Sequence, residues 1–161
     1  MTTTDAHTLP DGCSRTQLHI HADLRELGRA REALQRAAQP VLGARTHMMI
    51  LAVDEALSNV IRHGEHEAVA PAADGLYADA DNIEFEIAVT PQSVEVQITD
   101  PFAAFDPGVV ADVQLPERVR SRLRGGMGVG IMRLLLDKIE YARVDGRYNR
   151  LKLIKRREQL V

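Results

Sequence analysis

The chain has 161 residues, of which 45% are hydrophobic and 27% are charged, and its formal net charge is −3. This composition is typical of one soluble globular domain, and the weak negative charge with only 4% aromatic residues argues against a nucleic-acid-binding surface. The single cysteine, Cys13, excludes an internal disulfide framework and a cysteine-based zinc site. No apolar run approaches the roughly 20 residues of a membrane span, and the N-terminus lacks a secretory-signal pattern, so the sequence predicts a cytoplasmic protein.

The amino-terminal segment shows little periodicity. Residues 1–14 combine Thr, Asp and Gly with a proline and are predicted to form a mobile tail, ahead of a single domain over residues 15–157. Residues 17–22 alternate between polar and apolar side chains, which predicts a short strand. His19 and His21 fall on its polar side, and without further ligands nearby they fit a solvated strand face better than a metal pair.

Asp23 is a good N-cap for a first helix that extends to about residue 39, where Pro40 would end it. The apolar residues of this helix recur at three- and four-residue steps, as expected for one buried face. Arginines, Arg29 among them, populate the remaining surface. They form either a solvated basic face or a surface on which a partner docks.

A second helix is predicted to begin near residues 43–45 and to end at Gly64. Glu55 and Asn59 stand four residues apart and therefore lie one turn apart on one face, and His63 continues this row. A carboxylate can accept a proton or orient a hydroxyl, and a carboxamide oxygen is a suitable ligand for Mg²⁺. The alternative is a solvated helix edge, where Glu and Asn are common.

The middle of the chain predicts a hairpin between two loops. Residues 65–81 have little periodicity and are predicted to form a loop. Residues 83–89 and 94–98 alternate cleanly around a short turn, which predicts two strands that each bury one face. Asp100 follows at the end of the second strand. The next connection, residues 101–124, is long for a compact domain, and such a connection is usually functional or disordered.

Four glycines, Gly125, Gly126, Gly128 and Gly130, precede an apolar helical segment over residues 131–136. Glycine lets the backbone approach a ligand closely, and the free N–H groups at a helix start can receive an anion. The pattern is neither the dinucleotide fingerprint nor a P-loop, because no Lys followed by Ser or Thr is present. The alternative is a hinge that lets the helix pack closely on the sheet.

The fold class follows from how the strands are connected. Residues 138–144 and 150–154 are predicted to be two further strands around a turn at Asp145 and Gly146. Strands and helices are interspersed, but the strands meet mainly through hairpins. The sequence therefore predicts an α+β fold rather than a doubly wound parallel sheet.

The order of these elements along the chain resembles that of a known family of domains. A helix with Glu-x-x-x-Asn, a strand ending in Asp, a long loop and a Gly-x-Gly helix start follow one another as in the ATP-binding domain of the GHKL (Bergerat) superfamily, which includes histidine kinases and DNA gyrase. More closely, the chain resembles the anti-sigma-factor serine/threonine kinases of bacterial partner-switching systems. Residues 53–64 (VDEALSNVIRHG) are similar to the N-box of that family, residues 99–107 (TDPFAAFDP) lie where its first glycine box lies, and residues 125–131 (GGMGVGI) are similar to its second.

The resemblance covers about residues 18–155 and implies a two-layer sandwich. In it, a mixed, mostly antiparallel sheet is covered on one face by about three helices. The implied ligands are ATP and Mg²⁺, under a lid formed by residues 107–124. The resemblance places four residues at the ATP phosphates, with backbone N–H groups from the glycines and a charged donor from the arginine: Gly126, Gly128, Gly130 and Arg124.

The resemblance also implies roles for the polar residues. Asn59 would hold Mg²⁺ between the phosphates, and Glu55 would act as the catalytic general base or orient the hydroxyl of a Ser or Thr on a partner protein. Asp100 would accept a hydrogen bond from the adenine amino group. His63 would be structural, and Arg29 lies about where relatives contact their partner.

The chain departs from the family at Phe102, because the first glycine box usually has glycine two residues after the Asp. A side chain at this position could crowd the adenine pocket or shift the loop, which would weaken ATP binding. Glu55 and Asn59 argue the other way, since a protein without kinase activity has no chemical need for the pair.

The function implied by the resemblance is an ATP-dependent protein serine/threonine kinase. It would sequester a sigma factor or a comparable regulator and phosphorylate a STAS-type anti-anti-sigma protein. One alternative is a binding-only module with weak or no ATP binding. Another is an autonomous ATP hydrolase or a histidine-kinase fragment, although the segment before Leu18 leaves no room for a dimerisation and phosphoacceptor domain. Relatives are commonly dimers, so a homodimer is a further expectation, whereas direct contacts with nucleic acid or membrane are not expected.

Overall fold

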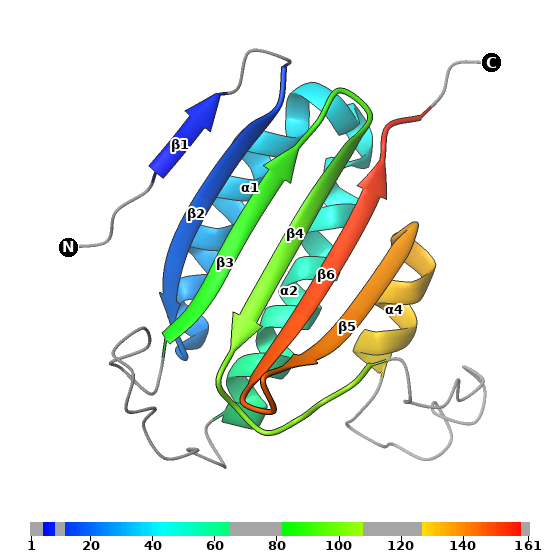
Figure 1. Ribbon diagram of the computed structural model, residues 1–161. Helices are drawn as coiled ribbons and strands as arrows, with labels where there is room; N and C mark the ends of the chain where they lie inside the picture. Colours follow the sequence, from blue (N-terminus) through cyan, green and yellow to red (C-terminus); the bar gives the residue numbers. More distant parts are fainter. Residues whose placement is uncertain (1–4, 9–11, 65–81, 108–126, 159–161) are drawn as a thin grey trace.

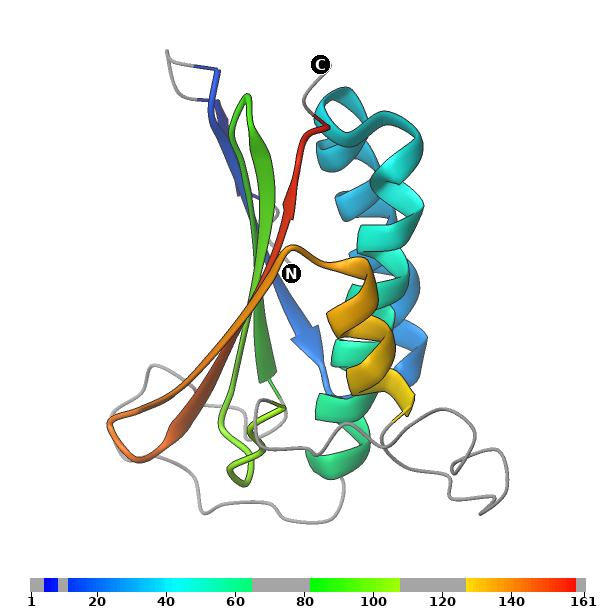
Figure 2. The ribbon, with the colours of Figure 1, turned by 90° about the vertical axis from the view of Figure 1, so that its right-hand side faces the viewer.

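The computed structural model describes residues 5–8, 12–64, 82–107 and 127–158. These residues form two layers, a six-stranded sheet and a layer of helices that covers one of its faces (Figures 1 and 2). The strand order is β1-β2-β3-β4-β6-β5, and every strand pairing between described residues is antiparallel. The α+β two-layer class predicted from the sequence is confirmed.

The strands follow one another mostly as hairpins, and their bounds are β1 (Asp5–Thr8), β2 (Ser14–His21), β3 (Asn82–Val89), β4 (Ser93–Asp100), β5 (Lys138–Val144) and β6 (Tyr148–Arg156). Both predicted hairpins, β3–β4 and β5–β6, are present. The β5–β6 turn has positive φ at Asp145 (52°) and Gly146 (64°), the backbone that matches the twist of a tight hairpin. Because β6 pairs with β4, Asn149 at the start of β6 lies opposite Asp100 at the end of β4.

The amino-terminal stretch, expected to be a tail, contains a strand. β1 pairs with β2 from Asp5 opposite Gln17 to Thr8 opposite Ser14. β2 also begins earlier than predicted, at Ser14. Pairing at a sheet edge is made by backbone groups, so a strand of four residues without an alternating apolar pattern leaves no signal in the sequence.

The helix layer consists of α1 (Leu27–Leu42), α2 (Thr46–Gly64) and α4 (Met127–Leu135), with short 3₁₀ turns at Leu24–Glu26 and Gly43–Arg45. Asp23 caps the first of these turns, because its side chain accepts a hydrogen bond of 2.8 Å from the N–H of Arg25. The expectation that Pro40 ends the first helix is wrong. Pro40 lies inside α1, and the helix continues to Leu42. Proline already has a helical φ, and Leu42 is buried, so packing favours completion of the turn.

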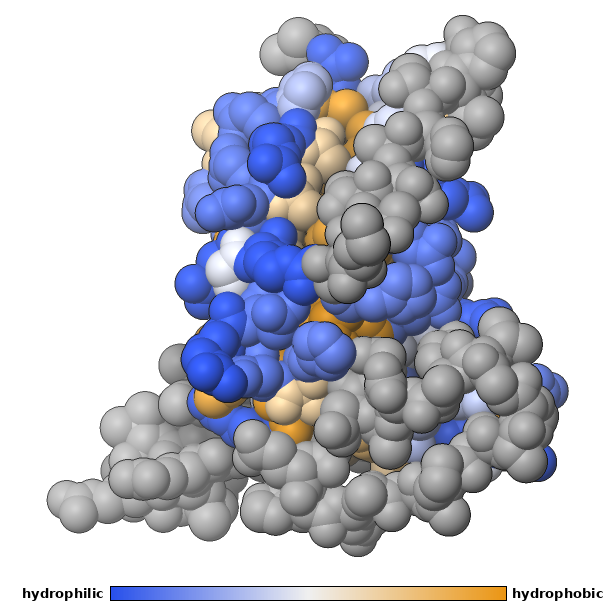
Figure 3. Space-filling view, turned by 90° about the vertical axis from the view of Figure 1, so that its left-hand side faces the viewer, coloured by the Kyte–Doolittle hydropathy of each residue, from blue (hydrophilic) through white to orange (hydrophobic). Residues whose placement is uncertain are grey.

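The hydrophobic core lies between the two layers. Its fully buried side chains come from both sides: Phe85, Ile98 and Leu153 from the sheet, and Leu57 and Ile61 from α2. Figure 3 shows part of this core as a hydrophobic band between two hydrophilic surfaces, on the side of the molecule where β1 and β2 lie. Burial of one face of α2 fixes the rotation of that helix, and therefore which of its side chains are available to a ligand.

The polar side of β2 faces solvent. His19 and His21 are exposed, whereas Leu18 and Ile20, which alternate with them, are buried, and this confirms the predicted alternation. Within the described residues, no three His, Cys, Asp or Glu side chains come together in a way that could hold a metal ion. None of the helices in that part of the chain is long and apolar enough to cross a membrane.

Candidate active site

The polar pair predicted on the second helix lies where α2 meets α4. Glu55 and Asn59 are half-buried, and their neighbours Ala56 and Leu57 are fully buried. Packing of these apolar neighbours orients the helix, so the carboxylate and the carboxamide point along one side of it toward α4, which packs beside α2.

The first turn of α4 comes very close to this pair. A Cβ atom added to Gly128 would lie 2.5 Å from Oε2 of Glu55 and 3.4 Å from Nδ2 of Asn59. The first of these distances is too short for non-bonded atoms, so the absence of a side chain at Gly128 leaves the space that the Glu55 carboxylate occupies. The tertiary structure thus brings together the predicted general base, the predicted Mg²⁺ ligand and one of the predicted glycines.

The helix that carries the glycines begins earlier than predicted. α4 begins at Met127, so Gly128 and Gly130 lie in its first turn rather than in a turn before it. The first N–H groups of an α-helix have no partner inside the helix, and this turn can therefore receive an anion. Gly130 is exposed, and a Cβ there would meet nothing within 4 Å. The predicted phosphate contacts Gly126 and Arg124 lie outside the described residues.

Asp100, the last residue of β4, is a buried carboxylate with a fixed orientation. It is 2% exposed, and its Oδ1 accepts hydrogen bonds from the N–H of Phe102 at 3.0 Å and from Nδ2 of Asn149 at 2.8 Å. Burial raises the pKa of the Asp100 carboxyl, while the hydrogen bonds from Asn149 and Phe102 and the charge of Arg143 partly oppose this shift.

Asn149 holds this corner of the site together, and sequence reasoning missed it. Its Nδ2 also donates to the carbonyl of Ala103 at 2.9 Å, and its Oδ1 accepts from the hydroxyl of Tyr141 at 2.7 Å and from Nη1 of Arg143 at 2.8 Å. Both the oxygen and the nitrogen of the amide are therefore engaged by the protein. Asn149 alternates with the buried Leu151 and Leu153 along β6, so it occupies a position where an apolar residue is expected. This exception to the alternation was the only signal in the sequence.

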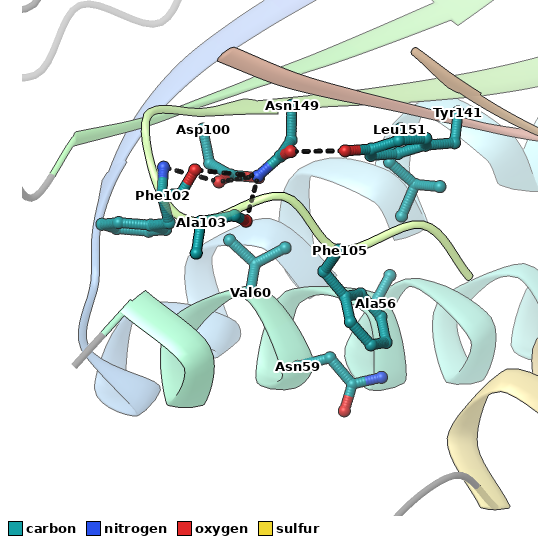
Figure 4. Close-up of a pocket in the computed structure, with 10 residues that line it drawn as sticks. All are labelled: Ala56, Asn59, Val60, Asp100, Phe102, Ala103, Phe105, Tyr141, Asn149 and Leu151. Carbon is teal, nitrogen blue, oxygen red and sulfur yellow. Dashed lines mark hydrogen bonds between the residues drawn. The ribbon is translucent and has the colours of Figure 1, made fainter. Parts of the chain in front are cut away.

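A cavity lies between α2 and this polar corner (Figure 4). Its lining comes from both layers and from the loop after β4: Ala56, Asn59, Val60, Asp100, Phe102, Ala103, Phe105, Tyr141, Asn149 and Leu151. Only about 20 Å³ is open inside it, which is the space of about one water molecule. Figure 4 shows the ring of Phe105 extending from the loop toward Ala56 and lying beside Asn59.

The side chain that fills the cavity is therefore Phe105 rather than Phe102. Phe102 borders the cavity but is only 3% exposed and belongs to the hydrophobic core. In Figure 4 its ring points away from Phe105 and Asn59. The sequence pointed to Phe102 as the side chain that would crowd the cavity, but the ring that extends into it belongs to Phe105. No pattern in the sequence indicated this residue.

Among the described residues, the predicted Arg29 is not part of the lining of this cavity. Arg29 forms an ion pair with Glu26 at the start of α1, and its role toward a partner stays a prediction. His63 lies in the last turn of α2, and its side chain is outside the described part of the structure. Of the predicted lid, only Pro107 is described; its carbonyl accepts a hydrogen bond from Nη2 of Arg133 on α4 at 2.9 Å.

An antiparallel sheet backed by helices, with a carboxylate and a carboxamide aimed at the start of a glycine-bearing helix, is the plan of an ATP-binding protein of the GHKL class. The family model of the histidine kinase-like ATPase domain matches residues 20–155. This match spans most of the chain, and the protein belongs to that family. A comparison with curated proteins finds no match.

The described residues fit the polar parts of ATP and Mg²⁺. Asn59 supplies an amide oxygen of the kind that a hard divalent cation prefers, and the Glu55 carboxylate lies on the same side of α2. The first turn of α4 offers N–H groups to phosphates. A base would need the space between Asp100 and Asn59, where only about 20 Å³ is open and the ring of Phe105 lies beside Asn59.

Proposed function

We propose that this protein is an ATP- and Mg²⁺-dependent serine/threonine kinase of the cytoplasm. It acts as an anti-sigma factor or a similar regulator and phosphorylates a STAS-type anti-anti-sigma protein. Its membership of the histidine kinase-like ATPase family indicates ATP binding. The observation that carries the step from binding to transfer is the convergence of Glu55 and Asn59 on Gly128 at the start of α4.

Glu55 has the chemistry of a general base in this proposal. The hydroxyl oxygen of the partner's Ser or Thr forms a bond to the terminal phosphorus, the bond from that phosphorus to ADP breaks, and Glu55 takes or orients the hydroxyl proton. A positioned base contributes about 10²- to 10⁴-fold to such a rate. Asn59 would hold Mg²⁺, which neutralises charge on the phosphate oxygens.

The proposed reaction is suited to switching partners. A phosphate group adds about −1.5 to −2 charges to the surface of the STAS protein. A change of this size at a docking surface is large enough to break an interface. Phosphorylation would then release the STAS protein and leave this protein available for the regulator that it sequesters.

A second candidate function is favoured by the small volume of the cavity. With about 20 Å³ open between Asp100 and Asn59, the described structure has no room for a base. A protein that sequesters its partner without nucleotide and without phosphotransfer would need no such room. The two candidates differ in whether Mg-ATP binds at all.

Calorimetry with Mg-ATP separates them. We expect micromolar binding by the wild type and binding weaker by about tenfold or more for Asn59→Ala, because the variant loses the Mg²⁺ ligand. Ser58→Ala truncates the neighbouring side chain of the same helix and is expected to bind like the wild type. Absence of binding at millimolar Mg-ATP would reject the kinase and favour the binding-only protein.

Glu55→Gln separates binding from transfer. Glutamine keeps the size of the side chain but cannot take a proton, so we expect an unchanged Kd for Mg-ATP and a transfer rate lower by about 10²-fold or more. The assay follows radiolabelled γ-phosphate onto STAS-domain proteins from the same genome, with the modified residue located by mass spectrometry. ATP binding without transfer to any Ser or Thr of these proteins would contradict the proposal.

A further inference from the structure

We infer that the ring of Phe105 occupies the place of the nucleobase, so that Phe105 and ATP compete for one cavity and Phe105 sets the affinity of the protein for ATP. The inference rests on the proposed function, since it takes the cavity between α2 and β4 to be the base pocket. It goes beyond that function because it assigns a role in ATP affinity to Phe105, a residue of the loop after β4.

The position of the ring is the first argument. Phe105 lines the cavity together with Asn59 on one side and Asp100 on the other, the two residues between which a bound ATP would extend. In Figure 4 the ring lies between the polar corner around Asn149 and the α2 helix, beside Ala56. An aromatic ring at this place contacts the same apolar surface of α2 on which a flat base would lie.

The size of the remaining space is the second argument. A cavity of about 20 Å³ admits about one water molecule, and a bicyclic purine is many times larger. A base can enter only if a side chain leaves. Removal of a phenyl ring would open a space comparable to the six-membered ring of adenine.

Phe105 is the lining residue best placed to move out of the cavity and make room for a base. The other lining residues, apart from Phe102 and Ala103, belong to α2 and to strands of the sheet. Phe102 is part of the core, and Ala103 has only a methyl group. Among the described residues that line the cavity, Phe105 is the large side chain that lies outside helices and strands and is only partly buried.

Competition of this kind lowers the apparent affinity. If only a fraction of the molecules has the ring outside the cavity, the apparent Kd for ATP equals the intrinsic Kd divided by that fraction. A smaller side chain at position 105 raises the fraction, and a larger apolar one lowers it. The affinity for ATP is then expected to follow the size of the side chain at this position.

The first test measures the Kd of Mg-ATP by calorimetry for the wild type, Phe105→Leu and Phe105→Ala. We expect binding to tighten in that order, by about fivefold or more for Phe105→Ala. Magnesium tripolyphosphate is the matched probe, because it carries the phosphates without a base. Its Kd is expected to be the same for all three proteins. Thermal melts verify that the variants are folded.

The second test follows the ring directly. The chain contains no tryptophan, so Phe105→Trp introduces the only indole, whose emission can be excited separately from that of the tyrosines. We expect the emission of a buried indole in the free protein and a shift to longer wavelength as Mg-ATP is added. The control is Leu134→Trp, since Leu134 is 83% exposed and the emission of an indole at this position should not change with Mg-ATP.

The outcomes distinguish this inference from the proposed function. Tighter ATP binding by Phe105→Ala than by the wild type supports the inference. The inference would be overturned, and the proposed function left intact, if the wild type binds ATP, Phe105→Ala binds it equally or more weakly, and the emission of Phe105→Trp does not shift with Mg-ATP. Failure of both the wild type and Phe105→Ala to bind millimolar Mg-ATP would overturn both.

Discussion

Asp100 shows how neighbours determine the chemistry of a single side chain. Its carboxyl is almost completely buried, and burial disfavours the charged form. Hydrogen bonds from Asn149 and from the N–H of Phe102 act in the opposite direction and also fix its orientation. The result is a desolvated acceptor that faces the candidate base pocket.

Stability should therefore depend on the ionisation of Asp100. Its pKa is raised in the folded protein above the usual 3.8, so the stability associated with the neutral carboxyl is fully present below that value and is lost as the pH rises through the raised pKa. We expect Asp100→Asn, which keeps the shape without the charge, to be more stable than the wild type at neutral pH. Urea unfolding at several pH values measures the difference, which should shrink on acidification. A difference that grows toward low pH would contradict this account.

The residues of the site differ in whether they could be predicted from the sequence. Glu55 and Asn59 could be placed on one face from their spacing alone, because a helix has a fixed period. Asn149 and Phe105 could not, since their importance comes from partners on other elements. Asn149 meets Asp100 only because β6 pairs with β4, and Phe105 meets Asn59 only because the loop folds back over α2.

At the scale of elements, the contact between α2 and α4 forms the polar half of the site. Gly128 allows the close approach, because any side chain there would meet the Glu55 carboxylate. The atom that would be displaced is the end of a flexible side chain, so the helix pair can persist while the position of the carboxylate changes.

Gly128→Ala should therefore impair transfer more than folding. A displacement of about 1 Å at a reacting group can cost about 10²-fold in rate, and we expect a loss of that order in the phosphotransfer assay. The free energy of unfolding should stay within about 1 kcal/mol of the wild type, because alanine also favours the helix. The control is Gly28→Ala on α1, where an added Cβ meets nothing within 4 Å. Equal transfer rates for the two variants would show that the contact with Glu55 is unimportant.

Element boundaries show where local patterns fail. The hairpins were predictable, because alternation and turn residues are local signals. The continuation of α1 past Pro40 and the start of α4 at Met127 were not, since burial and packing outweigh the local preference at a helix end. The second difference matters for function, because it moves Gly128 into the helical turn that contacts Glu55.

At the scale of the whole molecule, the core holds the two layers in register and so keeps the two halves of the site together. Phe85 is central to this packing, because it is fully buried on β3 with Leu18 of β2 and Ile98 of β4 as its neighbours across the sheet. The site residues on α2 and on β4 belong to opposite layers, so their separation depends on this core.

We expect Phe85→Ala to lower the free energy of unfolding by about 3–5 kcal/mol through lost burial and the cavity left behind. This is a large part of the roughly 5–15 kcal/mol that stabilises a typical domain. Urea unfolding measures it, with Leu134→Ala as the exposed control, for which a change within about 0.5 kcal/mol is expected. A small effect of Phe85→Ala would mean that the layers are held together elsewhere.

The sequence by itself determined the class of this protein: the α+β fold, the motifs of a GHKL ATPase and the face of the helix that carries Glu55 and Asn59. These features depend on local periodicity and on residue types at fixed spacings. The tertiary structure alone decided the strand order, the hydrogen bonds of Asn149 and the position of Phe105 in the lining of the cavity. These depend on contacts between residues far apart in the chain, where packing and burial, rather than local preference, select the arrangement.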